Sequence, residues 1–409
     1  MSSTKIVQPS NRTIYPVLFI ISACHLLNDS LQAVIPAMFP ILEKSLGLTF
    51  TQLGLIAFSL NMVASVSQPV IGMVTDTRPM PFALPIGLIS SMFGMLGLAL
   101  APSFPFILIS VVFIGLGSAT FHPEGSRVAY LAAGPRRGLS QSIFQVGGNT
   151  GQSLAPLITA LVLVPLGQFG AIWFTLAAGM AVILLFYIAK WYQQQIIVVD
   201  ENHQSKSPKT TIKQKKQIIP NKVINNTIFL LVIIVFARTW YHITILNFYA
   251  FYTMEQYGFS ISKAQIYIFI FLFVGAVGTF FGGPISDRFG KKTVIILSFI
   301  VPIPFAILLP FVNAIFSFIL LIIIGFFIMS SFSVTVVYAQ ELKPNKVGTM
   351  SGLIVGLAFG MGAIGSVVIG SLIDWISLTP TMIIVSFIPI IGLLSFLLPK
   401  DESVSKWYV

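Results

Sequence analysis

Long apolar runs separated by short polar turns dominate this chain. Twelve of the runs reach about 20 residues, the length that an α-helix needs to cross the hydrocarbon core of a bilayer. We therefore predict an all-α membrane protein with twelve transmembrane helices. The predicted spans are residues 15–42, 50–75, 83–101, 104–126, 139–164, 169–192, 224–254, 262–286, 292–311, 314–341, 349–374 and 380–399.

The longest polar segment, 193–223, carries six lysines and separates six spans from six. It predicts an N-terminal half (1–192), a cytoplasmic basic linker (193–223) and a C-terminal half with a short tail (224–409). The halves repeat weakly, because Asp76 and Asp287 follow equivalent spans and lie 211 positions apart. Two pseudo-symmetric six-helix bundles of this kind are the architecture of one large class of secondary transporters.

Composition and charge exclude several classes of protein. Only 9% of the 409 residues are charged, against about 25% in a soluble protein. This excludes a soluble enzyme and, despite a net charge of +11, a protein that binds nucleic acid. With both termini and the linker in the cytoplasm, twenty of the 23 Lys and Arg residues lie inside, Lys44 and Lys263 lie outside, and Arg238 lies within a span. We predict a multi-pass protein of the cytoplasmic (inner) membrane.

Cofactor signals are missing from the sequence. One cysteine, Cys24, excludes an intramolecular disulfide and a multi-cysteine metal site. The phosphate-binding pattern Gly-x-x-x-x-Gly-Lys-Ser/Thr is also missing. We expect no metal, no cofactor and no enzymatic activity, and a monomer in the lipid bilayer that draws energy from an ion gradient.

Two loop motifs point to a transporter family. Gly283-Pro-Ile-Ser-Asp287-Arg288-Phe-Gly290-Lys-Lys follows the eighth span, and Gly72-Met-Val-Thr-Asp76-Thr-Arg78 follows the second. The first motif resembles the cytoplasmic loop signature of the major facilitator superfamily, and the second is a degenerate copy. The resemblance implies a gating role for Asp76, Arg78, Asp287 and Arg288. An ordinary basic loop is the alternative for a single copy.

A narrower resemblance covers almost the whole chain. The segments 25–29 (HLLND), 121–129 (FHPEGSRVA), 141–149 (QSIFQVGGN) and 337–342 (VYAQEL) are similar to the fosmidomycin-resistance branch of that superfamily. The resemblance implies proton-coupled efflux by alternating access, with fosmidomycin, a small anionic phosphonate antibiotic, as the type substrate. Transport of a natural metabolite or lipid, with incidental drug efflux, is the alternative. The chain departs from many exporters in lacking an arginine deep in the fourth span, at 111–117.

Ionisable residues within spans are costly and mark functional candidates. Asp29 lies about 14 residues, or roughly 21 Å, into the first span. His25 lies one turn earlier on the same face. We predict that this pair carries protons, whereas hydrogen bonding of Asn28 and Asp29 to neighbouring helices is the structural alternative.

Arg238 lies at a similar depth in the seventh span, the repeat counterpart of the first. A guanidinium can hold a phosphonate through two parallel hydrogen bonds, so we predict substrate binding by Arg238 and by His242, one turn on. A permanent ion pair between Arg238 and Asp29 is the alternative. Polar side chains expected to line the cavity are Gln32, Gln68, Gln145, Asn149, Gln152, Tyr241 and Asn247.

The fourth span ends in a polar group, placed by its predicted limits near the cytoplasmic side. His122 and Glu124 are expected to help carry protons, and Arg127 is spaced to pair with Glu124. An interfacial salt bridge or a cytoplasmic gate fits this group. Glu341, in the corresponding helix of the other half, is a predicted gate partner.

Small residues in the fifth span, Gly147 and Gly151, allow close helix packing, and Pro156 follows them. The alternatives are fixed packing and a sliding contact during transport.

Overall fold

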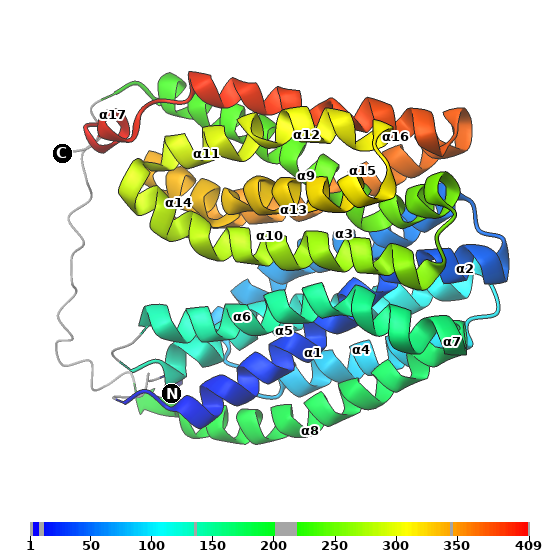
Figure 1. Cartoon of the computed structure of the whole chain (residues 1–409). Coiled ribbons are helices and arrows are strands. Elements are labelled where there is room, and N and C mark those ends of the chain that lie inside the picture. The colour runs from blue at the N-terminus through cyan, green and yellow to red at the C-terminus, as the bar shows by residue number, and fades with distance from the viewer. Residues whose placement is uncertain (1–2, 8–11, 135–136, 201–218, 344–346, 408–409) are drawn as a thin grey trace. The chain divides into compact units, whose positions relative to one another are not determined.

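A computed structural model describes residues 3–7, 12–134, 137–200, 219–343 and 347–407 of the chain. These residues are almost entirely helical (Figure 1). They contain twelve helical segments that are long and apolar enough to cross a membrane, which confirms the predicted count and fits a multi-pass membrane protein. The long helices are α1 (Tyr15–Ala37), α3 (Phe50–Thr77), α4 (Ala83–Leu100), α5 (Phe104–Ala132), α6 (Arg137–Ile158), α8 (Ile172–Gln194), α9 (Asn221–Tyr257), α10 (Ile261–Phe289) and α15 (Val347–Ile376).

Several of the predicted spans are interrupted helices. The ninth consists of α11 (Lys291–Ile300) and α12 (Pro302–Leu308), and the tenth of α13 (Ala314–Ser330) and α14 (Phe332–Leu342). The twelfth begins as α16 (Leu378–Ser386) and continues as a 3₁₀ segment, Ile388–Leu397. Pro302 has no N–H to donate to the preceding turn, which accounts for the break before α12. Hydropathy alone does not reveal such breaks, because the apolar character continues across them.

The chain divides into two compact units. The first comprises Met1–Ile35, Met62–Ala155 and Leu166–Lys213, and the second comprises Pro36–Asn61, Pro156–Pro165 and Gln214–Val409. The second unit therefore takes in the short helix α2 (Phe39–Leu46), the first part of α3 and a π-helical segment at Thr159–Leu163. Those segments precede the linker in sequence.

In the first unit, α4 packs against both α5 and α8 (Figure 1). Two short strands, β1 (Ser3–Val7) and β2 (Ile196–Asp200), pair antiparallel and join the N-terminal segment to the beginning of the predicted linker. The run Ile-Ile-Val-Val at 196–199 is β-branched throughout, which favours a strand. The linker lysines at 206–216 lie outside the described residues.

In the second unit, α9 packs against α15 and α10 packs against α13. The apolar core of α9, α11, α14 and α15 also buries Val404 and Trp407 of the C-terminal tail. The Tyr338 hydroxyl donates to the Pro399 carbonyl at 2.8 Å. The tail is therefore packed onto the unit, whereas the sequence predicted only a short terminal extension.

The first turn of α3 is held by a carboxylate near the end of α15, within the second unit. Asp374 accepts hydrogen bonds from the backbone N–H groups of Phe50 and Thr51 at 3.0 and 2.7 Å. It also accepts one from the Thr51 hydroxyl at 2.6 Å. The first N–H groups of a helix lack partners within the helix, so Asp374 acts as a cap supplied by another helix.

Candidate functional site

A buried polar cluster in the first unit surrounds Asp29, which is 2% exposed. The Nε2 atom of His25 lies 3.4 Å from one Asp29 oxygen, and the Nε2 atom of His122 lies 3.2 Å from the other. His25 and Asp29 come from α1 and His122 from α5. Two imidazoles thus flank the two oxygens of one carboxylate. We call these three residues the triad.

The other ring nitrogen of each histidine faces a backbone carbonyl. Nδ1 of His25 lies 2.8 Å from the Phe144 carbonyl, and Nδ1 of His122 lies 3.0 Å from the Ser118 carbonyl. A carbonyl oxygen only accepts hydrogen bonds, so both Nδ1 atoms carry a hydrogen. Each Nε2 atom therefore carries the lone pair of a neutral ring, and each one faces Asp29.

Amide donors complete the surroundings of Asp29. Asn28 Nδ2 donates to Oδ1 and Gln152 Nε2 donates to Oδ2, both at 3.0 Å. Gln32 lies 3.5 Å from Oδ1 and accepts a hydrogen bond from the Ser118 hydroxyl at 2.7 Å. The i, i+4 spacing predicted the contact of His25 with Asp29. No sequence signal singled out Ser118 or the Phe144 carbonyl, because their roles depend on helix packing.

His122 occupies a different position from the one expected. The sequence placed it near the cytoplasmic end of a span covering 104–126, whereas α5 continues to Ala132. The longer helix brings residue 122 further inside the span, beside Asp29. The hydroxyl and glycine residues of this segment lower its apparent hydropathy, which explains the short prediction.

The triad also has the spacing of a metal site, since one ligand atom from each residue lies within 4.8 Å of the others. Both Asp29 oxygens, however, already accept hydrogen bonds from amide N–H groups. Each of these hydrogen bonds uses one of the two lone pairs of its oxygen. The expectation of no metal therefore stays a prediction.

Close packing of α1 against α6 holds the triad together. A Cβ atom at Gly147 would collide with the Ser22 carbonyl, and one at Gly151 with the Leu26 carbonyl. A Cβ atom at Gly148 would lie 2.5 Å from His25 Nε2 and 2.8 Å from Asp29 Oδ2. The glycines therefore form a tight contact, and a sliding role for Gly147 and Gly151 stays a prediction.

We expect Gly148→Ala to lower the thermal stability of the protein and to impair transport driven by a pH gradient. Overpacking a tight contact costs about 1–3 kcal/mol, and here the atoms displaced belong to the triad. Thermal unfolding in detergent measures the first effect. The control is Gly179→Ala, whose Cβ would have only Met92 Sδ nearby, at 3.7 Å. A Gly148→Ala protein that melts like the control contradicts the prediction.

Near the C-terminal end of α5, Glu124 is fully buried and lies 3.5 Å from Arg127 Nε, as its spacing predicted. Arg127 also donates to the backbone carbonyl and the hydroxyl of Thr75, in the last turn of α3. This guanidinium satisfies a carbonyl at a helix C-terminus, where positive charge is favourable. Roles for Glu124 in proton transfer and for Arg127 in gating stay predictions.

Arg238 is 3% exposed and lies on α9 in the second unit. Its Nη1 atom donates to the Thr335 hydroxyl at 3.2 Å, and its guanidinium carbon lies 5.0 Å from the centre of the Phe332 ring. Among the described residues of that unit, no carboxylate lies within ion-pair distance of Arg238. The predicted relation between Arg238 and Asp29 concerns two different units and stays a prediction.

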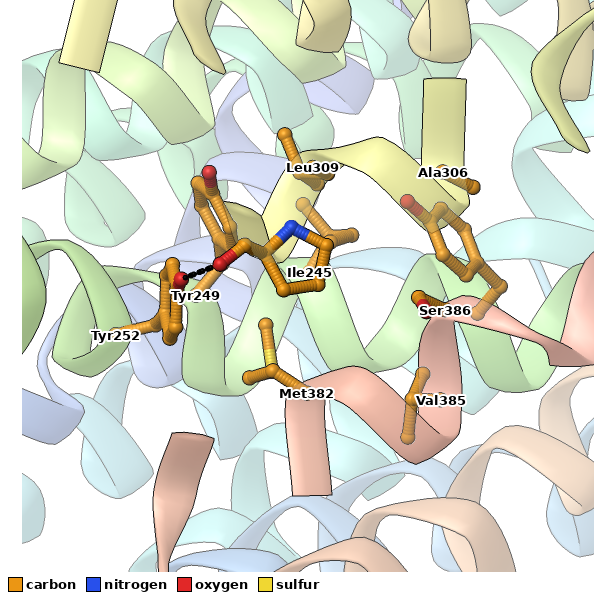
Figure 2. A pocket seen from close by; sticks show the side chains of 10 residues that line it. Ile245, Tyr249, Tyr252, Ala306, Leu309, Met382, Val385 and Ser386 are labelled. Atoms are coloured by element: carbon orange, nitrogen blue, oxygen red, sulfur yellow. Dashed lines mark hydrogen bonds between the residues drawn. The ribbon is translucent and has the colours of Figure 1, made fainter. Parts of the chain in front are cut away.

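Two further predicted binding residues lie close to Arg238 along α9. His242 packs against Phe271 with ring centres 5.3 Å apart, and its buried Nδ1 has no hydrogen-bond partner among the described residues. Tyr241 lines a cavity of about 10 Å³, bounded by side chains of α9, α12 and α16 (Figure 2). The buried Tyr241 hydroxyl also lacks a partner in the described part of the chain. A cavity of this size fits about one water molecule.

The remaining predicted residues are scattered. Gln145 donates to Asn149 at 3.3 Å on α6, Gln68 is half-buried on α3, and Asn247 donates to Ser366 at 2.9 Å. Arg78, Asp287 and Arg288 are exposed, while the Asp76 side chain lies outside the described part of the structure. Glu341 pairs with Lys291 at 2.9 Å, and Pro156 lies near the end of α6. Their binding and gating roles stay predictions.

Comparison with known proteins places this geometry in a family. The chain matches the Major Facilitator Superfamily over residues 18–362. It is 59% identical over 404 residues to YfnC of Bacillus subtilis strain 168, an uncharacterized MFS-type transporter, covering 99% of this chain and 98% of that protein. It is 42% identical over 391 residues to the fosmidomycin resistance protein of Escherichia coli K12, covering 96% and 94% respectively.

Solved structures show the same fold. A bacterial homologue of the human lysosomal transporter Spinster, in an inward-facing and occupied conformation, has a TM-score of 0.75 at 17% identity, over 95% of this chain and 97% of that chain. The nucleoside transporter NupG has a TM-score of 0.70 at 13% identity, over 96% and 99%. These matches confirm the predicted resemblance and fold class, and the relatives are transporters, not enzymes. This chain therefore belongs to the major facilitator superfamily of membrane transporters.

Proposed function

We propose that this transporter exports small anionic phosphonates of the fosmidomycin type in exchange for protons, by alternating access. The observation that carries the proposal is the buried guanidinium of Arg238, which has no carboxylate partner in the described part of its unit. A buried charge without a counter-ion is strongly unfavourable. An anionic substrate would supply that counter-ion.

The surroundings of Arg238 suit a phosphonate. A guanidinium has five N–H donors, and the structure gives one hydroxyl acceptor, Thr335, in the described residues. Parallel N–H donors match the oxygen atoms of a phosphonate in a bidentate arrangement. His242, one helical turn further along α9, offers a buried nitrogen that has no partner among the described residues. The name of the relative from Escherichia coli supports fosmidomycin as a member of the substrate class.

The triad supplies the site for the exchanged proton. Asp29 and His25 are almost fully buried, and the nitrogens that take up protons face the carboxylate directly. A membrane potential that is negative inside favours both proton entry and anion exit, at about 2.3 kcal/mol per charge for each 100 mV. In an exchange of a proton for an anion, the membrane potential therefore drives both movements.

Transport in proteoliposomes tests the proposal. Purified protein is reconstituted, a pH gradient is imposed, and accumulation is measured for fosmidomycin, a lipophilic cation and a panel of neutral metabolites. We expect accumulation of the phosphonate that collapses when an ionophore dissipates the gradient. Accumulation of the cation or a metabolite in place of the phosphonate would contradict the proposed substrate class. Phosphonate transport that ignores the gradient would contradict proton coupling.

A further inference from the structure

We propose that the triad holds two protons, one at each contact between an imidazole and Asp29, and that His122 is the side chain through which both protons enter and leave. The proposal deepens the proposed proton-coupled function and rests on it. It predicts that two protons are exchanged for each substrate molecule.

The number of sites follows from the hydrogen-bond directions. Because both Nδ1 atoms donate to backbone carbonyls, neither histidine can turn its lone pair away from Asp29 without losing that hydrogen bond. In the absence of added protons, each Nε2 lone pair faces a carboxylate oxygen at 3.2–3.4 Å. One proton converts one repulsive contact into a hydrogen-bonded ion pair, and only a second proton converts the other.

The bound protons reside on the imidazoles, because the groups around Asp29 donate hydrogen bonds to its carboxylate. Each of its oxygens accepts an amide N–H, from Asn28 and from Gln152. These hydrogen bonds stabilise the ionised carboxylate. Among the described residues, the charged and titratable side chains placed against Asp29 are the two imidazoles, from α1 and α5, while α6 contributes the neutral amide of Gln152. The net charge of the triad thus changes from −1 when empty to +1 when filled.

The carboxylate of Asp29 opposes the repulsion between two imidazolium ions. One ligand atom from each triad residue lies within 4.8 Å of the others, and each Nε2 lies 3.2–3.4 Å from a carboxylate oxygen. Coulomb energy falls as the inverse of distance. A short-range attraction to the carboxylate therefore holds each imidazolium and opposes the repulsion between the two rings.

The two histidines of the triad differ in their exposure. The His122 side chain is 27% exposed, whereas His25 is 1% exposed. We therefore assign the delivery and removal of protons to the His122 ring. The proton on His25 must pass through His122 and the Asp29 carboxylate, which touches both rings. His122 is therefore the port, meaning the residue at which protons enter and leave the triad. His25 holds the proton that lies further inside.

The proton-to-substrate ratio tests the two-proton site. In proteoliposomes with the potential clamped at zero, the fosmidomycin ratio at which net flux stops is measured at several imposed pH differences. The ratio is referred to one ionic form of fosmidomycin. We expect its logarithm to change by two for each pH unit in the unaltered protein, and by one in His25→Gln. A slope of one in both proteins overturns the two-proton site but leaves proton-coupled export intact, whereas a slope of zero overturns the proposed function itself.

Chemical modification tests the role of His122 independently of the proton-to-substrate ratio. Diethyl pyrocarbonate acylates those unprotonated imidazole nitrogens that the reagent can reach. Mass spectrometry of the purified full-length protein then identifies the modified histidines. We expect His122 to react at least tenfold faster than His25, and transport by His25→Gln to remain sensitive to the reagent. Equal reaction rates for the two histidines would overturn the assignment of His122 as the port.

Discussion

Arg238→Ala is expected to abolish transport of anionic substrates. Hydrogen bonds to a charged group contribute about 1.5–3 kcal/mol each. The loss of two such bonds to a phosphonate corresponds to a fall in affinity of at least about 100-fold. Binding of fosmidomycin to the purified protein, measured by calorimetry, and uptake into proteoliposomes both check this result.

Measurements of thermal stability distinguish a binding role for Arg238 from a structural role. An uncompensated buried guanidinium lowers stability, because the charge is removed from water without a counter-ion. We therefore expect Arg238→Met to unfold at a temperature equal to or above that of the unaltered protein, while losing fosmidomycin binding. The matched control is Lys222→Ala, which removes an exposed positive charge from the same helix. Undiminished efflux by Arg238→Ala would contradict the proposed role, and a large loss of stability in Arg238→Met would indicate a structural one.

Asp29→Asn is expected to uncouple transport from the pH gradient. The asparagine amide can donate a hydrogen bond to one neutral imidazole without any added proton. The contact with that imidazole therefore no longer depends on whether a proton is bound. Exchange of labelled for unlabelled fosmidomycin across the membrane should continue. Initial rates of uptake with and without an imposed gradient measure the effect, and we expect their ratio to fall to about one.

The control for Asp29→Asn is the same substitution at an exposed carboxylate. Asp374→Asn alters the cap of α3 and leaves the triad unchanged, so its rates should retain their dependence on the pH gradient. An Asp29→Asn protein that responds to the gradient as strongly as Asp374→Asn would show that the proton is carried elsewhere.

Some of the candidate site could be predicted from local spacing. The i, i+4 separation of His25 and Asp29 is a property of one helix, and it correctly predicted their contact. The same reasoning predicted the pairing of Glu124 with Arg127, at i, i+3. The contact of His122 with Asp29 joins residues 93 positions apart, and it depends on how α1, α5 and α6 cross. No local pattern carries that information.

The amino-acid pattern alone determined the twelve spans and the family, and it placed Asp29 and Arg238 within spans, because a bilayer requires long apolar helices and penalises each charge within them. Tertiary structure decided which polar atoms meet. Close packing at Gly147, Gly148 and Gly151 brings α6 onto α1, and the carbonyls of Phe144 and Ser118 then orient the two imidazoles toward Asp29. Hydropathy measures the transfer of a segment from water, whereas the direction of a hydrogen bond depends on a neighbour distant in the sequence.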